Sequence, residues 1–279
     1  MTVSRAIYLP DGSINYNTTD FANGIEQGMF ITELATPGQA VRITTSGVFR
    51  GNNARDIIAP IANIPATAAD ATNERIDIVQ GDAASNIINI KDGTPAVSDD
   101  SNPVPPAPDT GFEILRYIKR RANNNVILRN DDGVNSFLYG FNFQRFLPTI
   151  RVKATTSNPS FNATTFTGIS EMEVAVYLKR DSVIRLQFSS NLQINNANTE
   201  LEVGFFVNGS QIAGATNLSE DNSIVGRATA NSKTFIYMSS QIRLAAGAYK
   251  IVVKGFVNSG SVTFLAMRRK MLFDILGET

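Results

Sequence analysis

The 279-residue sequence contains no cysteine, no histidine and no tryptophan. The absence of cysteine excludes disulfide bonds, thiolate zinc sites and a thiol nucleophile. The absence of histidine excludes a Ser-His-Asp triad, imidazole metal ligands and an imidazole base. Neither G-x-x-x-x-G-K-[ST] nor G-x-G-x-x-G occurs, so nucleotide binding has no support. We therefore expect no cofactor, no metal site and no catalytic residue, and the chain is predicted not to be an enzyme.

A net charge is also lacking, because 25 basic side chains balance 25 acidic ones. A chain without net charge has no strong field to attract nucleic acid or an anionic membrane. The sequence has no apolar run of the roughly 18 residues that a membrane-spanning helix needs, and its first residues lack the apolar core of a secretory signal. We expect neither a nucleic-acid partner nor insertion into a membrane.

Turn-forming residues, by contrast, are abundant: the chain has 27 Asn, 20 Gly and 11 Pro. Gly and Asn accept positive φ angles, and Asn and Asp side chains bond to their own backbone in turns. The apolar segments between them are short and rich in Val, Ile, Phe and Thr, which suit a pleated sheet. The composition predicts a mainly β protein. The patterns along the chain divide it into a small N-terminal β domain, a Pro-rich linker and a C-terminal β-sandwich or jelly roll.

The N-terminal β domain is predicted over residues 1–110 and is expected to consist of hairpins. Apolar and polar side chains alternate over residues 41–44 as in a half-buried strand, and Ser46-Gly47 then predicts a hairpin turn into the next strand. Residues 75–82 and 85–93 predict a second pair of strands.

A Pro-rich stretch over residues 93–111 marks the clearest boundary in the chain, because it holds five prolines. Proline fixes φ and cannot donate a ladder hydrogen bond, so the stretch is predicted to be an extended spacer. The alternative is that it lies flat on one domain. Residues 111–157 are assigned to a linker or neck, in which 112–133 fits either an amphipathic helix or a strand.

The C-terminal domain is predicted over residues 158–279. Its apolar segments are short and alternate with polar residues, as in 184–188 and 201–207, at spacings that suit a β-sandwich or jelly roll. Asn208-Gly209 is the strongest short hairpin signal in the chain.

Several motifs carry a resemblance to a known family. TPG-x-A-V-R-I-x-x-S-G-V (36–48), N-x-R-I-D-I-V (73–79) and I-x-I-x-x-GTPA (88–96) precede the prolines in this order. Over roughly residues 20–115 the order resembles a domain of bacteriophage tail and baseplate structural proteins of the tail-fibre or receptor-binding appendage type. The following stretch, RYIKRRANNNVILRN, departs from the short apolar strand of that pattern. The L-x-x-G-x-Y motif that ends at Tyr249 is similar to trimeric jelly-roll tips of the same proteins and, more loosely, to tumour-necrosis-factor-like domains.

The resemblance implies an oligomeric virion protein, with a homotrimer as the expected state, assembled in the host cytoplasm and located in the virion tail. Its N-terminal domain would dock onto other tail or baseplate proteins. Its C-terminal domain would face the host and could bind a cell-surface polysaccharide. Two alternatives stay open: a capsid decoration or head-fibre protein without receptor binding, and a polysaccharide-degrading enzyme that works with carboxylates.

Loops at the ends of the predicted sandwich supply candidate receptor-binding residues, because loops on a rigid scaffold often carry binding groups. Amide and carboxylate side chains there could pair with sugar hydroxyls, although ordinary loop composition in an Asn-rich chain is the favoured explanation. The candidates are Asn195, Asn196, Asn198, Asn217, Asp221 and Asn222.

Candidate subunit contacts come from a basic cluster and from aromatic residues on outward faces. Arg116 and Arg120 belong to the densest cluster of positive charge, which could face solvent, bind phosphate or pair with a neighbouring subunit. Phe206 and Phe256 are expected on outward faces of the jelly roll, where exposed aromatic residues would be consistent with a subunit interface.

Acidic residues offer little chemistry beyond these candidates. Glu171 and Glu173 lie two apart on a predicted strand, as a glycosidase pair could, but we expect both to face solvent. The pairs Asp99-Asp100 and Asp131-Asp132 lack the spacing of a calcium loop and predict turns instead. Arg269, in a basic trio near the C-terminus, is expected to cover apolar surface with its stem while its charge reaches water.

Overall fold

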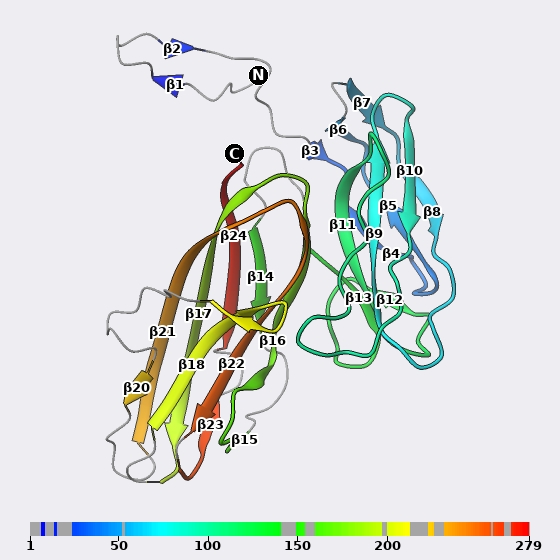
Figure 1. The fold of residues 1–279 in the computed structure, drawn as a ribbon. Helices are drawn as coiled ribbons and strands as arrows, with labels where there is room; N and C mark the ends of the chain where they lie inside the picture. The colour runs from blue at the N-terminus through cyan, green and yellow to red at the C-terminus, as the bar shows by residue number, and fades with distance from the viewer. Residues whose placement is uncertain are drawn as a thin grey trace.

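The computed structural model describes most of the chain, and every element in that part is a β-strand (Figure 1). The prediction of a mainly β protein is therefore confirmed. No helix in the described part is long and apolar enough to cross a membrane. The described residues are 7–8, 14–15, 24–51, 54–140, 149–153, 160–196, 200–212, 223–225, 232–257, 259–264 and 269–278.

The N-terminal body is built on a five-stranded sheet with the order β10-β9-β11-β13-β12. Its strands are β9 (Arg75–Asp82), β10 (Ile87–Lys91), β11 (Glu113–Arg120), β12 (Ile127–Leu128) and β13 (Ser136–Tyr139). The predicted strand pair β9–β10 is present and antiparallel. The segment that fitted helix or strand begins with a strand, β11, which pairs with β9 along its length and lies in the middle of the sheet.

Two three-stranded sheets cover one face of this sheet. One has the order β3-β6-β7 and the other β4-β5-β8. Their strands are β3 (Gly24–Gly28), β6 (Gly47–Gly51), β7 (Ala54–Ile58), β4 (Ile31–Glu33), β5 (Ala40–Ile43) and β8 (Ile61–Pro65). A separate pair, β1 (Ile7–Tyr8) and β2 (Ile14–Asn15), is formed near the N-terminus.

The predicted hairpin at Ser46-Gly47 is wrong, because the strands before and after it lie in different sheets. β5 pairs with β4 and β8, whereas β6 pairs with β3 and β7. The chain turns a corner at Ser46, whose carbonyl oxygen lies so close to Gly28 that a Cβ there would overlap it. Gly28 also has a φ of 62°, a conformation that glycine adopts without strain.

The C-terminal body consists of two antiparallel sheets (Figure 1). One contains β14 (Thr149–Lys153), β15 (Ser160–Phe161), β17 (Ser182–Ile194), β21 (Ser232–Leu244), β23 (Val262–Phe264) and β24 (Lys270–Glu278). The other contains β16 (Thr167–Leu178), β18 (Glu200–Val207), β19 (Ser210–Gln211), β20 (Ser223–Val225) and β22 (Gly247–Val257).

The order of these strands is that of a jelly roll. The principal pairings give β14-β24-β17-β21 in one sheet and β16-β22-β18-β20 in the other. The chain crosses from one sheet to the other after β15, β16, β17, β20, β21 and β22, so that the eight principal strands form two facing layers. The predicted C-terminal sandwich is confirmed, and the turns at 179–181 and 245–246 link the two layers.

Asn208-Gly209 forms the predicted two-residue hairpin loop between β18 and β19. Val207 lies opposite Ser210, and the two loop residues have φ angles of 47° and 81°. Positive φ at both positions is the geometry that makes Asn-Gly the preferred sequence for such a turn.

The jelly-roll core is formed by alternate side chains of the long strands. Ile184, Leu186 and Phe188 on β17 are at most 1% exposed, and the residues between them point outward. Phe264 and Phe273 close the same core from neighbouring strands. The alternation that the sequence shows over β17 therefore predicts the inward face correctly.

We expect Phe188→Ala to lower the free energy of unfolding by about 3 to 5 kcal/mol, because it opens a cavity in a close-packed core. Phe30→Ala is the matched control, since Phe30 is 52% exposed and its truncation leaves no cavity. Chemical denaturation followed by circular dichroism measures both. Equal losses in the two variants would contradict the assignment of the core.

Candidate functional site at the junction of the two bodies

The five-stranded sheet is a middle layer, because both of its faces are covered. On β11, Ile118 and Arg120 point toward the core of the N-terminal body, and Ile118 packs in it. Tyr117 and Lys119 point the opposite way, and Tyr117 packs against the core of the jelly roll. The junction of the two bodies is therefore built from the second face of this sheet and from β16, the edge strand that faces it.

Two tyrosine hydroxyls satisfy the backbone of β16 at this junction. The Tyr139 hydroxyl donates a hydrogen bond to the Ala175 carbonyl at 2.9 Å. The Tyr117 hydroxyl accepts one from the Tyr177 N–H at 3.2 Å and donates one to the Tyr177 carbonyl at 3.4 Å. The rings of Tyr117 and Tyr139 stack with centroids 5.3 Å apart. The contacts occupy backbone groups that an edge strand otherwise leaves unpaired.

Burial keeps both hydroxyls protonated and thus able to donate. It raises the pKa of Tyr117 to about 12, and it raises the pKa of Tyr139 well above its usual value. An ionised phenol here would lose its hydrogen and place a charge between two apolar cores. Hydrogen-bond donation at the junction therefore persists across the physiological pH range.

An ion cluster lies beside the tyrosines. Lys119 Nζ is 2.7 Å from Glu173 and 3.4 Å from Glu74, and Lys250 Nζ is 3.4 Å from the other oxygen of Glu173. Burial opposes ionisation of Glu173, but the two lysines outweigh it and lower its pKa. Burial likewise opposes the charge on Lys119, but Glu173 and Glu74 outweigh it and raise its pKa. Glu173 and Lys119 are therefore charged at neutral pH, and the cluster holds β11 to β16 and β22.

A further ion pair fixes the far end of the same junction. Lys179, just beyond β16, lies 2.6 Å from Glu113 at the start of β11 and donates to the Phe112 carbonyl at 3.1 Å. The Glu113 side chain is only 4% exposed. The two strands are therefore tied along most of the length of β11.

The Pro-rich stretch is not a free spacer: residues 98–102 lie on the jelly roll, whereas its ends are bonded to the N-terminal sheet, where Asp109 lies 2.5 Å from Lys91. Lys250 Nζ donates to the carbonyls of Asp99 and Asn102 at 2.6 and 2.7 Å, and Lys254 pairs with the Asp100 carboxylate. The two lysine side chains are 4% and 8% exposed. The loop 98–102 therefore covers the outer face of β22.

The stretch assigned to a linker or neck, 111–157, is divided between the two bodies. Its strands β11, β12 and β13 complete the N-terminal sheet, and β14 belongs to the jelly roll. Likewise, the N-terminal sheet runs past residue 110, because β9 pairs with β11 across the Pro-rich stretch. The chain passes from the N-terminal body to the jelly roll between β13 and β14.

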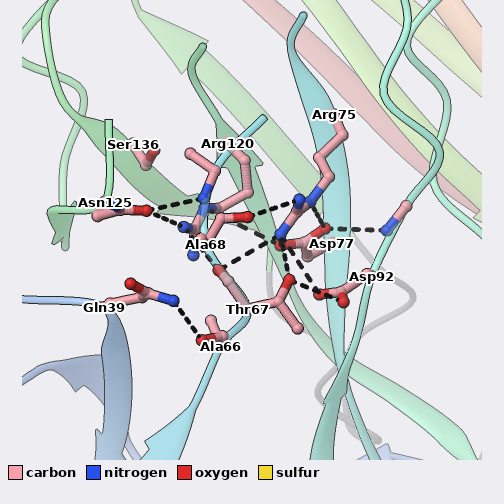
Figure 2. Close-up of polar contacts among 12 residues, drawn as sticks. Gln39, Ala66, Thr67, Ala68, Arg75, Asp77, Asp92, Arg120, Asn125 and Ser136 are labelled. Carbon is pink, nitrogen blue, oxygen red and sulfur yellow. Dashed lines mark hydrogen bonds and ion pairs between the residues drawn. The ribbon is translucent and has the colours of Figure 1, made fainter. Parts of the chain in front are cut away.

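A buried ionic cluster anchors the base of the Pro-rich stretch (Figure 2). Asp77 accepts hydrogen bonds from Arg75 Nε at 2.8 Å and from the Gly93 N–H at 2.9 Å. Arg75 Nη1 also donates to the Ala68 carbonyl at 2.9 Å, and Arg120 Nη2 donates to the Thr67 carbonyl at 3.1 Å. The cluster thus joins β9 and β11 to the loop before β9. Burial raises the pKa of Asp77 and lowers that of Arg120.

The predicted role of Arg116 and Arg120 as subunit contacts is corrected by their burial, since they are only 4% and 1% exposed. Arg116 donates to the Ile31 carbonyl, and burial lowers its pKa to about 9. Both guanidinium groups donate hydrogen bonds to carbonyls inside the N-terminal body. The strand β11 has buried side chains on both faces, so its basic residues form no exposed patch.

Phe206 and Phe256 do not form an open aromatic surface either. Phe166 packs on both, with ring centroids 5.3 and 5.1 Å away, and Lys254 Nζ lies 4.5 Å from the Phe206 ring centre. Phe206 is 8% exposed and Phe256 is half-buried. Segments of the same chain thus cover the face on which a subunit contact was expected.

The two candidate receptor-binding residues that the structure describes form hydrogen bonds with other residues of the chain. Asn195 Nδ2 donates to the hydroxyls of Ser261 and Thr263, at 3.0 Å each. Asn196 Oδ1 accepts from the Ser261 N–H at 3.1 Å. They join the end of β17 to β23. The other four candidates, Asn198, Asn217, Asp221 and Asn222, lie outside the described residues.

Glu171 and Glu173 do not face solvent as an isolated pair, because each meets cations. A register shift in β16 lies between Gly168 and Glu173. Glu171 lies 3.3 Å from Arg269, whose side chain is fully buried rather than reaching water. No group of acidic residues that could hold a metal ion occurs within the described ranges.

The predicted acidic turns are present. The Asp99 carboxylate accepts hydrogen bonds from the N–H groups of Ser101 and Asn102, at 2.7 Å each. Asp132 accepts from the N–H groups of the residues two and three positions later, and these bonds lower its pKa to about 2. Both carboxylates shape loops.

The residues that build the junction were not found by sequence reasoning. Tyr117 lies on β11 and Tyr139 on β13, and both point from the face of the N-terminal sheet that packs against the jelly roll. Lys250 and Lys254 carried one usable signal: they lie four apart on one face of a strand whose other face is apolar. Partly covered lysines on an otherwise apolar strand indicate that acceptors approach from elsewhere in the chain.

Comparison with known proteins identifies no family. No protein-family model matches the chain, and no curated protein shows significant sequence similarity to it. The solved structures with similarity include an Eiger TNF from S. frugiperda, 9% identical, covering 48% of this chain and 94% of that one with a TM-score of 0.30. They also include the VP2 subviral particle of infectious bursal disease virus, 10% identical, covering 92% and 75% with a TM-score of 0.31.

The Cry4Aa toxin from Bacillus thuringiensis is 8% identical and matches 92% of this chain and 53% of its own, with a TM-score of 0.24. Similarities at this level carry no argument about function. The strand order described above establishes the fold without them.

We expect Glu173→Gln to lower the free energy of unfolding at pH 7 by roughly 1 to 3 kcal/mol, because it leaves Lys119 and Lys250 without their shared carboxylate. The pKa of Glu173 is lower in the folded protein than its ordinary value of 4.5. Its contribution is therefore complete above 4.5 and is lost as the pH falls through the folded-state pKa. Urea unfolding at several pH values measures the difference from wild type. A difference independent of pH would contradict the ion cluster.

We expect Tyr117→Phe to expose the Tyr177 amide to exchange and to cost about 0.5 to 1.5 kcal/mol, the usual net value of a hydrogen bond. Hydrogen–deuterium exchange of peptides from β16 measures the loss of protection. Tyr249→Phe is the control, since Tyr249 lies on β22, the paired neighbour of β16, and its hydroxyl donates to the Ala245 carbonyl rather than to the backbone of β16. Unchanged protection of β16 in Tyr117→Phe would show that this edge is shielded by other means.

Proposed function

We propose that the chain is a structural protein of a bacteriophage virion, part of the tail tip, baseplate or fibre, and that it works as a homotrimer. The motifs over residues 36–96 support the phage assignment through their resemblance to tail and baseplate proteins. The jelly roll that follows supports it further, because the resemblance also implies such a tip. The protein would be located in the virion tail after assembly in the host cytoplasm.

The observation that carries this proposal is the set of buried contacts that joins the two bodies. Tyrosine hydroxyls, an ion cluster and the Pro-rich stretch all hold the second face of the N-terminal sheet to the jelly roll. A component that orients a host-facing domain relative to a particle needs a fixed angle between its two parts. A flexible tether would not provide one.

The environment of the carboxylates supports binding over catalysis. The general acid of a glycosidase has a raised pKa, whereas the two lysines lower the pKa of Glu173. Glu171 pairs with a buried arginine. A role as scaffold and attachment module needs neither residue to react.

In this proposal the N-terminal body binds other tail or baseplate proteins, and the C-terminal body faces the host surface. Contact with a cell-surface polysaccharide would be made by several weak sites at once. Multivalent contact of this kind raises the strength of attachment without a strong single site.

Antibody labelling of intact virions in electron micrographs tests the proposal. We expect label at the distal tail. Label on the capsid would favour a decoration or head-fibre protein, and the absence of label on complete virions would refute a structural role. Incubation with host surface polysaccharide is the companion assay: we expect no release of reducing ends, and their release would overturn the non-enzymatic assignment.

A further inference from the structure

Residues 96–109, which we call the strap, form an arm of the N-terminal body that reaches onto the jelly roll. Where the strap leaves the N-terminal sheet, the Ala96 N–H donates to the Glu74 carbonyl at 2.9 Å. Where it returns, the Asp109 N–H donates to a side chain of β9 at 2.9 Å. Between these two attachments, the loop 98–102 lies on the outer face of β22.

The ammonium group of Lys250 joins the strap to the ion cluster of the junction. It donates to the carbonyls of Asp99 and Asn102 in the strap, at 2.6 and 2.7 Å. Glu173 and the Ser98 hydroxyl lie 3.4 Å away. Because the lysine side chain is only 4% exposed, water has little access to these contacts. Lys250 thus belongs to the strap contacts and to the junction contacts at the same time.

These contacts form a closed circuit that passes through both bodies. From Lys250 the circuit leads to Glu173 on β16, whose other carboxylate oxygen is 2.7 Å from Lys119 on β11. Lys119 lies 3.4 Å from the Glu74 carboxylate, and the Glu74 carbonyl holds Ala96 at the start of the strap. The strap then leads back to Lys250.

Each half of the circuit depends on the other half to exclude water. A charge pair is stronger in a site of low dielectric constant than in water. If the strap lifts from β22, water reaches Lys250 and screens its attraction to Glu173. If the bodies separate, water solvates Glu173 and Lys119, and Lys250 loses the carboxylate that balances its charge.

We propose that the strap is a clasp, which closes on the jelly roll and holds the two bodies in one relative orientation, with Lys250 as the residue that couples strap and junction. The two sets of contacts then open and close together rather than independently. The inference rests on contacts within a single chain and goes beyond the proposed function. A location of the protein outside the virion tail would therefore leave it standing.

Hydrogen–deuterium exchange resolved to single amides tests the coupling in both directions. Asp99→Ala removes a carboxylate whose hydrogen bonds shape the loop 98–102 itself. We expect it to accelerate exchange of the Tyr177 amide on β16 by about three- to thirtyfold, as for coupled members of one network. Lys119→Met removes a cation of the junction, and we expect it to accelerate the Asn102 amide in the loop by a similar factor.

Two controls separate this coupling from a general loss of stability. Asp132→Ala removes a carboxylate that shapes a turn in the same way but lies outside the circuit, and it should leave the Tyr177 amide unchanged. The Leu186 amide, on a strand paired on both sides, reports global unfolding and should be accelerated less than Tyr177 in Asp99→Ala. Equal acceleration at both amides, or no change at Tyr177, would overturn the inference. Transmission in one direction alone would also overturn it, because a coupling free energy is reciprocal.

A distance measurement follows the orientation of the two bodies directly. Because the chain has no cysteine, spin labels can be attached through Val134→Cys and Gln241→Cys, at two exposed positions, one on each body. With labelled chains diluted in unlabelled protein, we expect a narrow distribution of distances without further changes, and a broader one after Asp99→Ala or Lys119→Met. A distribution that stays equally narrow in both variants would overturn the role of the strap as a clasp.

Discussion

The unpaired backbone of an edge strand must be satisfied wherever it is buried, and β16 is such a strand. Its free edge faces another body of the same chain, where water cannot supply the missing partners. The hydroxyls of Tyr117 and Tyr139 supply them. Because these rings also pack on the jelly-roll core, one pair of side chains joins the polar and apolar parts of the junction. The ion cluster around Glu173 and the position of the Pro-rich stretch both depend on this close approach of the two bodies.

The charged residues of the junction follow the same constraint. Lys250 and Lys254 point away from the core of the jelly roll and would ordinarily be solvated. Here carbonyls and a carboxylate of the loop 98–102 surround them, so that charge is buried with its partners. The buried pair of Arg75 and Asp77 performs the same task where that loop leaves the N-terminal sheet. Each buried cation thus positions a segment of irregular backbone.

Sequence patterns predicted those parts of the fold in which local chemistry and tertiary structure agree. The alternation over β17 and the Asn208-Gly209 turn depend on neighbours along the chain or across one hairpin, and both were predicted correctly. Ser46-Gly47 looks like a hairpin turn as well, but a turn signal does not say which strand will be the partner. Arg116 and Arg120 appeared as surface charge because their partners, including the carbonyls of Ile31 and Thr67, lie far away in sequence. The residues of the junction were not predicted for the same reason, since a contact between two bodies produces no periodic pattern in the sequence of either body.

The position of the Pro-rich stretch between β10 and β11 determines where the polypeptide can be divided. Both strands belong to one sheet, and β11 lies at its centre. A cut within the prolines would therefore remove the middle of that sheet together with everything downstream, whereas a cut between Gly140 and Thr149 would leave the sheet whole. Recombination that exchanges the C-terminal body between related genes would have to join at the later point. The gene that supplies the N-terminal body would then also supply the loop 98–102, which covers β22. The incoming jelly roll would therefore need lysines at the positions of Lys250 and Lys254 to bind that loop.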